Sequence, residues 1–198
     1  MFAPQPPDDR KSMKPPTEKP SESGMRFFTP ELYLRFNSSD DDIADRANEE
    51  WEEALEGYGE QLTRLRSKMP SPVRELADMC FHDWDFLGLD LRNQALNGWN
   101  GHQDANLWLE FAIVSLHEKN EVISLIYTIW DHVRENEPQT DWPFSKNRSH
   151  WMYDEIDLAP NRNELFVHRI LFSNGRVLEI PFRSVMIHRV GNRIGVAQ

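Results

Sequence analysis

The segment LFVHRILFSNGRVLEIPFRSVMIHRV, residues 165–190, constrains the fold more than any other part of the chain. Two runs rich in β-branched and aromatic residues flank the dipeptide Asn174-Gly175. Asn-Gly supplies the two positive φ angles of a type I′ turn, whose twist matches that of paired strands. The segment therefore predicts a β-hairpin with a type I′ turn. Pro181 has no N–H to donate to a neighbouring strand, so we expect its strand at a sheet edge or bulged there.

A second hairpin is predicted from two further runs of similar composition. Residues 107–117 and 121–132 are separated only by the turn-like sequence Glu-Lys-Asn. The first run is largely apolar on both sides of the predicted strand, which is typical of a central strand covered on both faces. Residues 92–106 are rich in Asn and Gly, and residues 134–150 contain two prolines, so both are predicted loops.

The preceding part of the chain, residues 25–80, carries the pattern of helices instead. Thr29 followed by Pro30 is a typical helix start, with a capping side chain and then proline in the first turn. From Ile43 to Met69 the apolar residues recur at steps of three and four, which predicts one long helix with an apolar stripe facing the sheet. Ser71-Pro72 repeats the cap-then-proline pattern and predicts a third helix.

The long predicted helix is strongly acidic on the side away from its apolar stripe. Like charges at helical spacing repel one another slightly, so helix stability does not explain their number. Four glutamates are therefore predicted to lie in water and to form a negative face suited to a basic partner: Glu49, Glu53, Glu56 and Glu60.

Together these patterns predict an α+β fold. We expect one domain over residues 25–198, helical over residues 25–80 and β-rich over residues 81–190. Its acidic N-terminal helical region is expected to pack on a mostly antiparallel sheet of about five strands that curls toward a half-barrel. Residues 1–24 contain six prolines and almost no apolar surface to bury. They are predicted to form a disordered, Pro-rich tail.

Composition narrows the classes of function. The formal net charge of −11 argues against nucleic acid or an anionic membrane as a partner, because phosphate groups bind clustered cations. A single cysteine, Cys80, excludes an internal disulfide. No signal peptide or membrane-spanning run is recognisable, so a cytoplasmic location is expected. No Gly-rich phosphate loop, His-Glu-x-x-His or Gly-x-Ser-x-Gly motif occurs, and we predict no cofactor.

The polar residues most suggestive of chemistry begin the β-rich region, beside Cys80. On a strand, His82 would point to one face and Asp83 to the other. One interpretation is structural, with both side chains forming hydrogen bonds where helix gives way to strand. The other is a metal-dependent hydrolase, in which His82 and Asp83 act with His150 and Asp154, because histidine and carboxylate are ligands for divalent ions.

Two further sets of polar residues are candidate sites. In HWMYDEIDL, residues 150–158, strand alternation would group Trp151 with Tyr153 and Glu155, opposite Asp154. That arrangement predicts an amphipathic element with an exposed acidic side, and no convergent set of ligands. His168 and His188, in the last hairpin, are expected on a surface that responds to pH.

Several segments together resemble an uncharacterised bacterial cytoplasmic family, a domain of unknown function. They are FTPELYLRFNSSDDD, the His82-Asp83 pair, WMYDEIDL and HRILFSNGRVLEIPF, and the resemblance spans residues 25–190. It implies no activity and no functional residues. A weaker similarity, carried by the overall charge and by a His-Asp strand followed by a β-meander, is to the acidic α+β immunity proteins that neutralise bacterial toxins.

The sequence therefore favours a non-catalytic protein-binding or regulatory module, in which the acidic helix meets a basic partner. An immunity-like role is one form of this hypothesis. The metal-dependent hydrolase remains the alternative.

Overall fold

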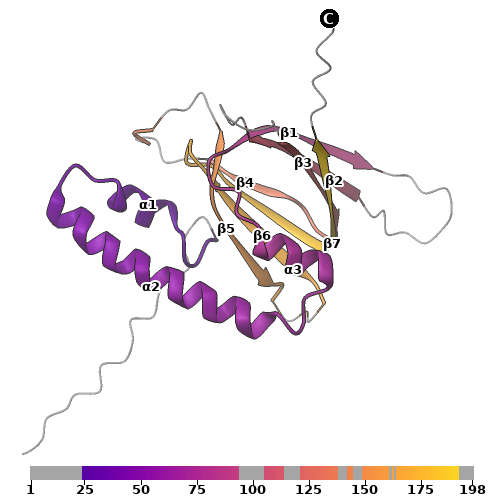
Figure 1. Ribbon diagram of the computed structural model, residues 1–198, viewed down its shortest axis with the longest axis horizontal. Helices are drawn as coiled ribbons and strands as arrows, with labels where there is room; N and C mark the ends of the chain where they lie inside the picture. The colour runs from indigo at the N-terminus through magenta and orange to yellow at the C-terminus, as the bar shows by residue number, and fades with distance from the viewer. Residues whose placement is uncertain are drawn as a thin grey trace, which may run out of the picture.

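The computed structural model describes residues 24–93, 105–113, 121–137, 142–144, 149–160, 162 and 164–191. Three helices precede seven strands in these residues, so the predicted α+β class is confirmed (Figure 1). The tail predicted over residues 1–24 lies outside the described residues, apart from Gly24.

The helices begin where the capping residues predict. Helix α1 (Pro30–Phe36) starts after Thr29, whose side chain accepts a hydrogen bond from the backbone of Leu32. Helix α2 (Asp41–Leu65) starts after Asp40, whose carboxylate accepts from the backbone of Ile43. None of the described helices is long and apolar enough to span a membrane.

The third helix begins slightly differently from the prediction. Helix α3 (Ser71–Asp78) has Pro70 as its N-cap residue, so Ser71 is the first helical residue and makes no capping hydrogen bond. Helix α2 has already ended before this proline, which has no N–H to continue a helix.

Seven strands form one sheet in which every pairing is antiparallel, two strands more than the sequence suggested. The short fourth strand lies in a segment that was predicted to be a loop. The strands are β1 (Trp84–Asn93), β2 (Ala105–Ile113), β3 (Glu121–Ile129), β4 (Arg134–Asn136), β5 (His150–Leu158), β6 (Phe166–Phe172) and β7 (Val177–Gly191).

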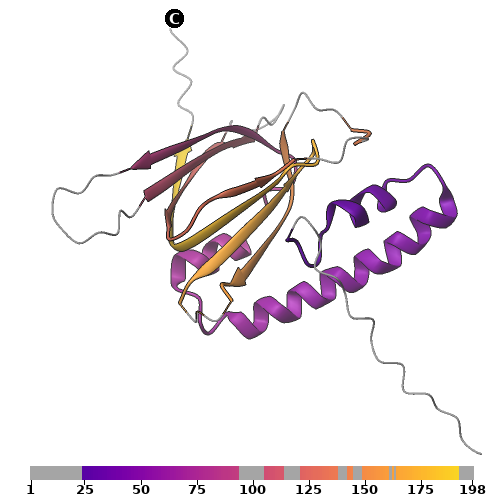
Figure 2. The ribbon, with the colours of Figure 1, turned by 180° about the vertical axis from the view of Figure 1, so that it is seen from behind.

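The sheet curls strongly, as the predicted half-barrel requires. Its strand order is β3-β2-β1-β5-β6-β7-β4. Strand β3 also pairs with β7 along the whole length of β3. The pairing of β1 with β5, in contrast, is limited to Trp84 with Trp151 and Asp85 with His150. Beyond that point the two strands diverge and the sheet stays open between them (Figures 1 and 2).

The predicted hairpin at Asn174-Gly175 is confirmed, but the type I′ turn is wrong. Gly175 has a φ of 84°, whereas Asn174 does not have a positive φ. The backbone N–H of Gly175 donates to the carbonyl of Phe172, and Phe172 in turn donates to Arg176. This is a three-residue loop with glycine in the left-handed position. A Cβ at Gly175 would also lie 2.5 Å from the ring of Trp142. Both the positive φ and the lack of space therefore require glycine at this position.

Pro181 lies where its strand changes neighbours. On one side Pro181 pairs with Val167 of β6. On the other side β4 pairs with β7 only as far as Glu179, and β3 pairs with it from Phe182 onward. The residue without an N–H therefore occupies the gap between two partner strands.

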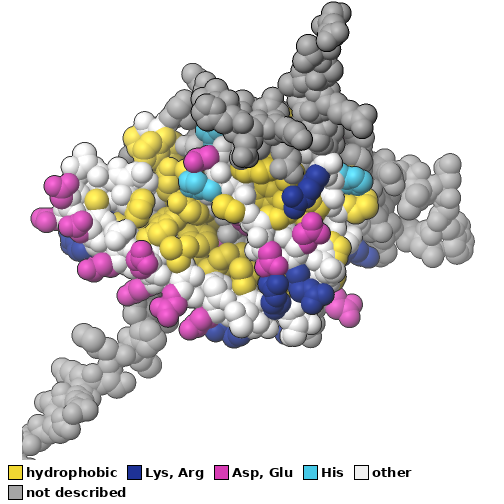
Figure 3. Space-filling view, viewed as in Figure 1, with side chains coloured by type: hydrophobic (Ala, Val, Ile, Leu, Met, Phe, Trp, Pro, Cys, Tyr) yellow, Lys and Arg dark blue, Asp and Glu magenta, His cyan; other side chains and the backbone are white. Residues whose placement is uncertain are grey.

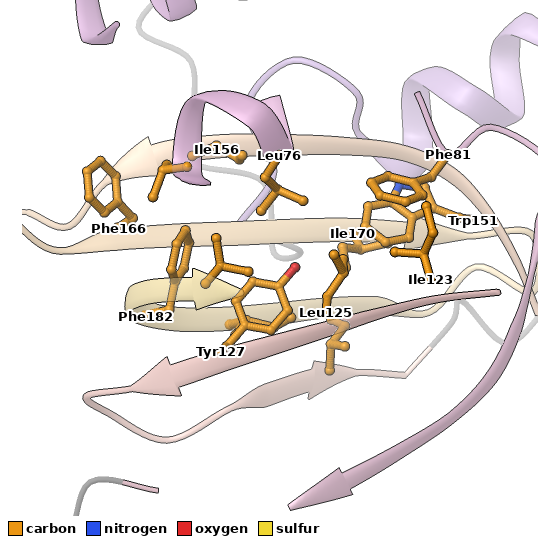
Figure 4. Close-up of a cluster of buried hydrophobic side chains, with 14 of the residues drawn as sticks. Leu76, Phe81, Ile123, Leu125, Tyr127, Trp151, Ile156, Phe166, Ile170 and Phe182 are labelled. Atoms are coloured by element: carbon orange, nitrogen blue, oxygen red, sulfur yellow. The ribbon is translucent and has the colours of Figure 1, made fainter. Parts of the chain in front are cut away.

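Two apolar clusters pack on opposite faces of the curled sheet. The inner core lies within the curl and includes Val73 and Leu76 of α3, Leu125 and Tyr127 of β3, and Ile170 of β6 (Figure 4). The outer core joins the N-terminal segment, α1 and α2 to the other face, and its buried residues are Met25, Phe28, Leu32, Ala47, Trp51, Leu171 and Val177.

Candidate binding surface

The N-terminal segment is fixed to the outer face of the sheet by one buried carboxylate. Glu155 of β5 is 1% exposed and accepts hydrogen bonds from the backbone N–H groups of Arg26, Phe27 and Phe28, at 2.7–3.1 Å. Burial raises the pKa of Glu155, although these three N–H groups and the charge of Arg169 act in the opposite direction. This carboxylate sets the position from which α1 begins.

Helix α2 is held against the same face by aromatic contacts and one hydrogen bond. The ring of Trp51 meets Tyr153 of β5 edge-on, with 4.5 Å between ring centroids. The hydroxyl of Tyr58 accepts the backbone N–H of Ile156 at 2.8 Å. The predicted stripe is correct at these positions but wrong at Ile43 and Leu55, which are 37% and 47% exposed.

The opposite side of α2 is acidic and lies in water, as predicted. Glu49, Glu53, Glu56 and Glu60 are all exposed. Of these four, only Glu60 has an ion-pair partner among the described residues, and that partner is the equally exposed Arg64. Surface pairs of this kind contribute little to stability. The acidic face is therefore presented by a helix whose other side is fixed.

An apolar area lies beside this acidic face. Figure 3 shows it between α1, α2 and α3, with acidic side chains in a row along α2. Tyr33 of α1 and Tyr153 of β5 are half-buried and pack against the outer core, with 6.2 Å between their ring centroids. Cys80, two residues after α3, is exposed. Burial raises the pKa of both tyrosines, and the nearby charge of Asp83 adds to the effect. Apolar surface of this kind on a folded protein commonly marks an interaction site.

His82 and Asp83 lie in a turn just before β1, so the predicted alternation on a strand is wrong for them. Asp83 has a φ of 65°, an uncommon conformation for a residue other than glycine. His82 Nδ1 donates to the carbonyl of Met152 at 2.8 Å, and its Nε2 lies 3.6 Å from the Asp83 carboxylate. The turn also donates a backbone hydrogen bond, from Asp83 N–H to the carbonyl of Trp151.

The four residues of the hydrolase hypothesis do not converge on one point. His150 Nδ1 lies 2.9 Å from the carboxylate of Asp85, a separate pair from His82 and Asp83. Asp154 instead faces the inner core and contacts His168. Within the described ranges there is no group of three or more histidine, cysteine or acidic side chains arranged to hold a metal ion.

The inner core contains a polar chain that the sequence did not reveal. His168 is fully buried, so the expectation of a surface histidine at this position is wrong. Its Nε2 donates to Asp154 at 3.1 Å, and its Nδ1 accepts from the hydroxyl of Tyr127 at 2.9 Å. The other oxygen of Asp154 accepts from the indole N–H of Trp151. The buried polar side-chain atoms of His168, Asp154 and Tyr127 all have hydrogen-bond partners in this network, as burial requires.

A bulge in β5 accounts for this arrangement. The pairing of β5 with β6 shifts register between Trp151 and Tyr153. The extra residue, Met152, moves Trp151 to the inner side with Asp154 and Ile156, while Tyr153 and Glu155 stay outside. The grouping predicted from strict alternation was therefore wrong for Trp151. No signal in a single sequence marks such a bulge.

Comparison with known proteins identifies no relative: no family model, no curated protein and no solved structure matches this chain.

Proposed function

We propose that this protein is a non-catalytic protein-binding module that engages a basic partner through the acidic face of α2 and the apolar area beside it. The observation that carries the proposal is the set of exposed glutamates on one side of a helix whose other side is fixed by Trp51 and Tyr58. Glu49, Glu53 and Glu56 have no ion pair within the described part of the chain, so their charge is available to another molecule.

The charge and the apolar surface would contribute in different ways. Unpaired carboxylates attract a basic surface over several ångströms and mainly raise the association rate, an effect that salt weakens. Apolar contact with the exposed Leu55 and with the half-buried Tyr33 and Tyr153 would then slow dissociation. A fixed helix loses little conformational freedom on binding, which also favours affinity.

Asp83 is the point where a partner's cation would be held most closely. Its carboxylate is 74% exposed and acts electrostatically on both Tyr33 and Tyr153. A lysine or arginine side chain placed there would gain an ion pair together with contact to the aromatic rings. A basic toxin domain is one class of partner with this chemistry, which would make the module immunity-like.

The test is a fourfold substitution of Glu49, Glu53, Glu56 and Glu60 by glutamine. Wild type and variant are immobilised and used to capture proteins from a lysate of the native host, and association of each captured protein is measured at several salt concentrations. We expect the variant to fold, and to associate at least tenfold more slowly with little dependence on salt. Leu55→Gln should instead leave association unchanged and speed dissociation.

The control removes charge elsewhere. Substituting Glu137 and Glu164, two exposed glutamates outside the helices, by glutamine should leave binding intact. If the α2 variant captures the same proteins at the same rates as wild type, the acidic face serves only solvation. If it fails to fold, the glutamates make internal interactions that the proposal excludes.

A further inference from the structure

The turn before β1 holds Asp83 in a backbone conformation that is unusual for aspartate. The N–H of Trp84 donates to the carbonyl of Phe81 at 3.0 Å and closes a β-turn over residues 81–84. Asp83 occupies the third position of this turn with a φ of 65°, where glycine or asparagine is normal. A residue with a side chain costs free energy in this conformation, and such residues cluster at binding sites. The turn therefore points to a role that the Asp83 side chain fills and glycine would not.

The carboxylate of Asp83 does not hold the turn together. The backbone N–H of Asp83, and not its side chain, joins the turn to the carbonyl of Trp151. The carboxylate lies 3.6 Å from Nε2 of His82, which is too long for a hydrogen bond. Among the residues that the structure describes, it makes no other ion pair or hydrogen bond. Both carboxylate oxygens can therefore accept hydrogen bonds from another molecule.

Two tyrosine rings lie beside this carboxylate. Tyr33 and Tyr153 are half-buried, and their rings are inclined at 58° to one another. The charge of Asp83 raises the pKa of both hydroxyl groups, after the larger effect of burial, so the carboxylate lies near both rings. Packing fixes the rings, because Tyr33 stacks on Trp142 and Tyr153 meets Trp51 edge-on. A fixed carboxylate beside fixed aromatic rings is an environment that attracts an organic cation.

We infer that Asp83, Tyr33 and Tyr153 bind the guanidinium group of an arginine on the partner of the acidic face, an inference that rests on the proposed function. A planar guanidinium can donate two parallel N–H groups to a carboxylate while its face lies against an aromatic ring. An ammonium group is more strongly hydrated, and in a site where the carboxylate is 74% exposed it would keep its water. Within this chain, Arg26 already lies over the ring of Phe27, with 5.0 Å from its guanidinium carbon to the ring centroid.

Three small probes test the guanidinium assignment on the full chain. They are the N-acetylated amides of arginine, of lysine and of citrulline, whose neutral urea has the shape of a guanidinium. Each is titrated while the NMR signals of the tyrosine rings are followed. We expect a saturable shift of the Tyr33 and Tyr153 signals with the arginine probe, binding at least about fivefold weaker for the lysine probe, and no response to the citrulline probe.

Variants at position 83 separate binding from folding. Asp83→Asn removes the charge and tolerates a positive φ, so it should fold and lose the response to the arginine probe. Asp83→Gly should lose the response as well, and should unfold at the same or a higher temperature, because glycine adopts a positive φ without steric cost. Asp45→Asn is the matched control, since Asp45 is an exposed aspartate on α2, and it should bind the arginine probe as wild type does.

Several results would overturn the inference. They are a wild type that gives no saturable response to the arginine probe, equal binding of the lysine or citrulline probe, and an Asp83→Asn variant that still binds. A marked loss of stability in both position-83 variants would also overturn it, because the carboxylate would then serve the turn. The probes do not require α2. If the probe fails while the fourfold α2 variant still loses its partners, only this inference is wrong. If the probe binds while that variant captures the same proteins as wild type, only the proposed function is wrong.

Discussion

Two adjacent residues of β5 attach the two faces of the sheet to their surroundings in different ways. Asp154 faces inward and bonds to the side chains of His168 and Trp151, which belong to β6 and to β5 itself. Glu155 faces outward and binds backbone N–H groups of residues 26–28, which precede the first helix and belong to no strand.

The two carboxylates stabilise different parts of the fold. The inner chain of Asp154, His168 and Tyr127 joins strands that backbone pairing already places, so it fixes side-chain positions within a formed core. Glu155 joins two parts of the chain more than 120 residues apart that share no backbone ladder. We therefore expect loss of the Glu155 carboxylate to open only the outer face locally. Loss of the inner Asp154–His168 network should instead lower the stability of the whole fold.

The largest effect is expected for Glu155→Ala. Three backbone N–H groups, one buried and two partly buried, lose a charged acceptor. This should cost about 3–5 kcal/mol, because hydrogen bonds to charged groups are strong and an unsatisfied buried donor is costly. Hydrogen exchange followed residue by residue should show residues 25–36 losing protection while Leu125 and Ile170 of the inner core keep it.

Glu164→Ala is the control for that measurement, since Glu164 is exposed and lies close to β6 in the sequence. It should change stability by less than about 0.5 kcal/mol. Loss of protection throughout the sheet in Glu155→Ala would show that the two faces unfold together, and the proposed contrast between them would be wrong.

A smaller effect is expected for His168→Ala. The substitution leaves a cavity and removes one partner from Asp154 and from Tyr127, which together should cost about 2–4 kcal/mol. Chemical denaturation should show a lower midpoint, and exchange protection should fall in both faces alike. His132→Ala, at an exposed histidine, should leave the midpoint unchanged. A His168 variant that releases only the N-terminal segment would contradict the assignment of its network to the inner core.

Much of the fold could be predicted because its signals are local. Thr29 with Pro30 marks the start of α1, and the three- and four-residue steps through Trp51 and Tyr58 orient α2. The sequence around Gly175 indicates a hairpin, although it did not specify the turn type, which depends on whether Asn174 also adopts a positive φ. One of the two additional strands, β4, was missed because it has only three residues and lacks a periodic pattern.

The buried polar groups could not be predicted, because each depends on contacts between distant residues. A bulge at Met152 decides that Trp151 and Asp154 share the inner face, and strict alternation gives the opposite result. In the sequence, Glu155 is one of several neighbouring acidic residues. Only in the folded chain do the backbone N–H groups of residues 26–28 reach its carboxylate. The exposed acids of α2, in contrast, follow directly from helical periodicity.

The smallest expected effect is a pH dependence confined to the outer face. Burial raises the pKa of Glu155 above its ordinary value of 4.5, so near that pH the folded protein holds this proton more tightly than the unfolded chain. Stability falls with rising pH wherever the folded state binds more protons, so the contribution of Glu155 is present at low pH and is lost as pH rises through the raised pKa. Subtracting the unfolding free energy of Glu155→Gln at each pH isolates this contribution, because the other titrating groups are common to both proteins. Between pH 4 and pH 7 we expect the difference, wild type minus variant, to decrease. An increase over the same range would mean that the three N–H groups stabilise the charged carboxylate more than burial destabilises it.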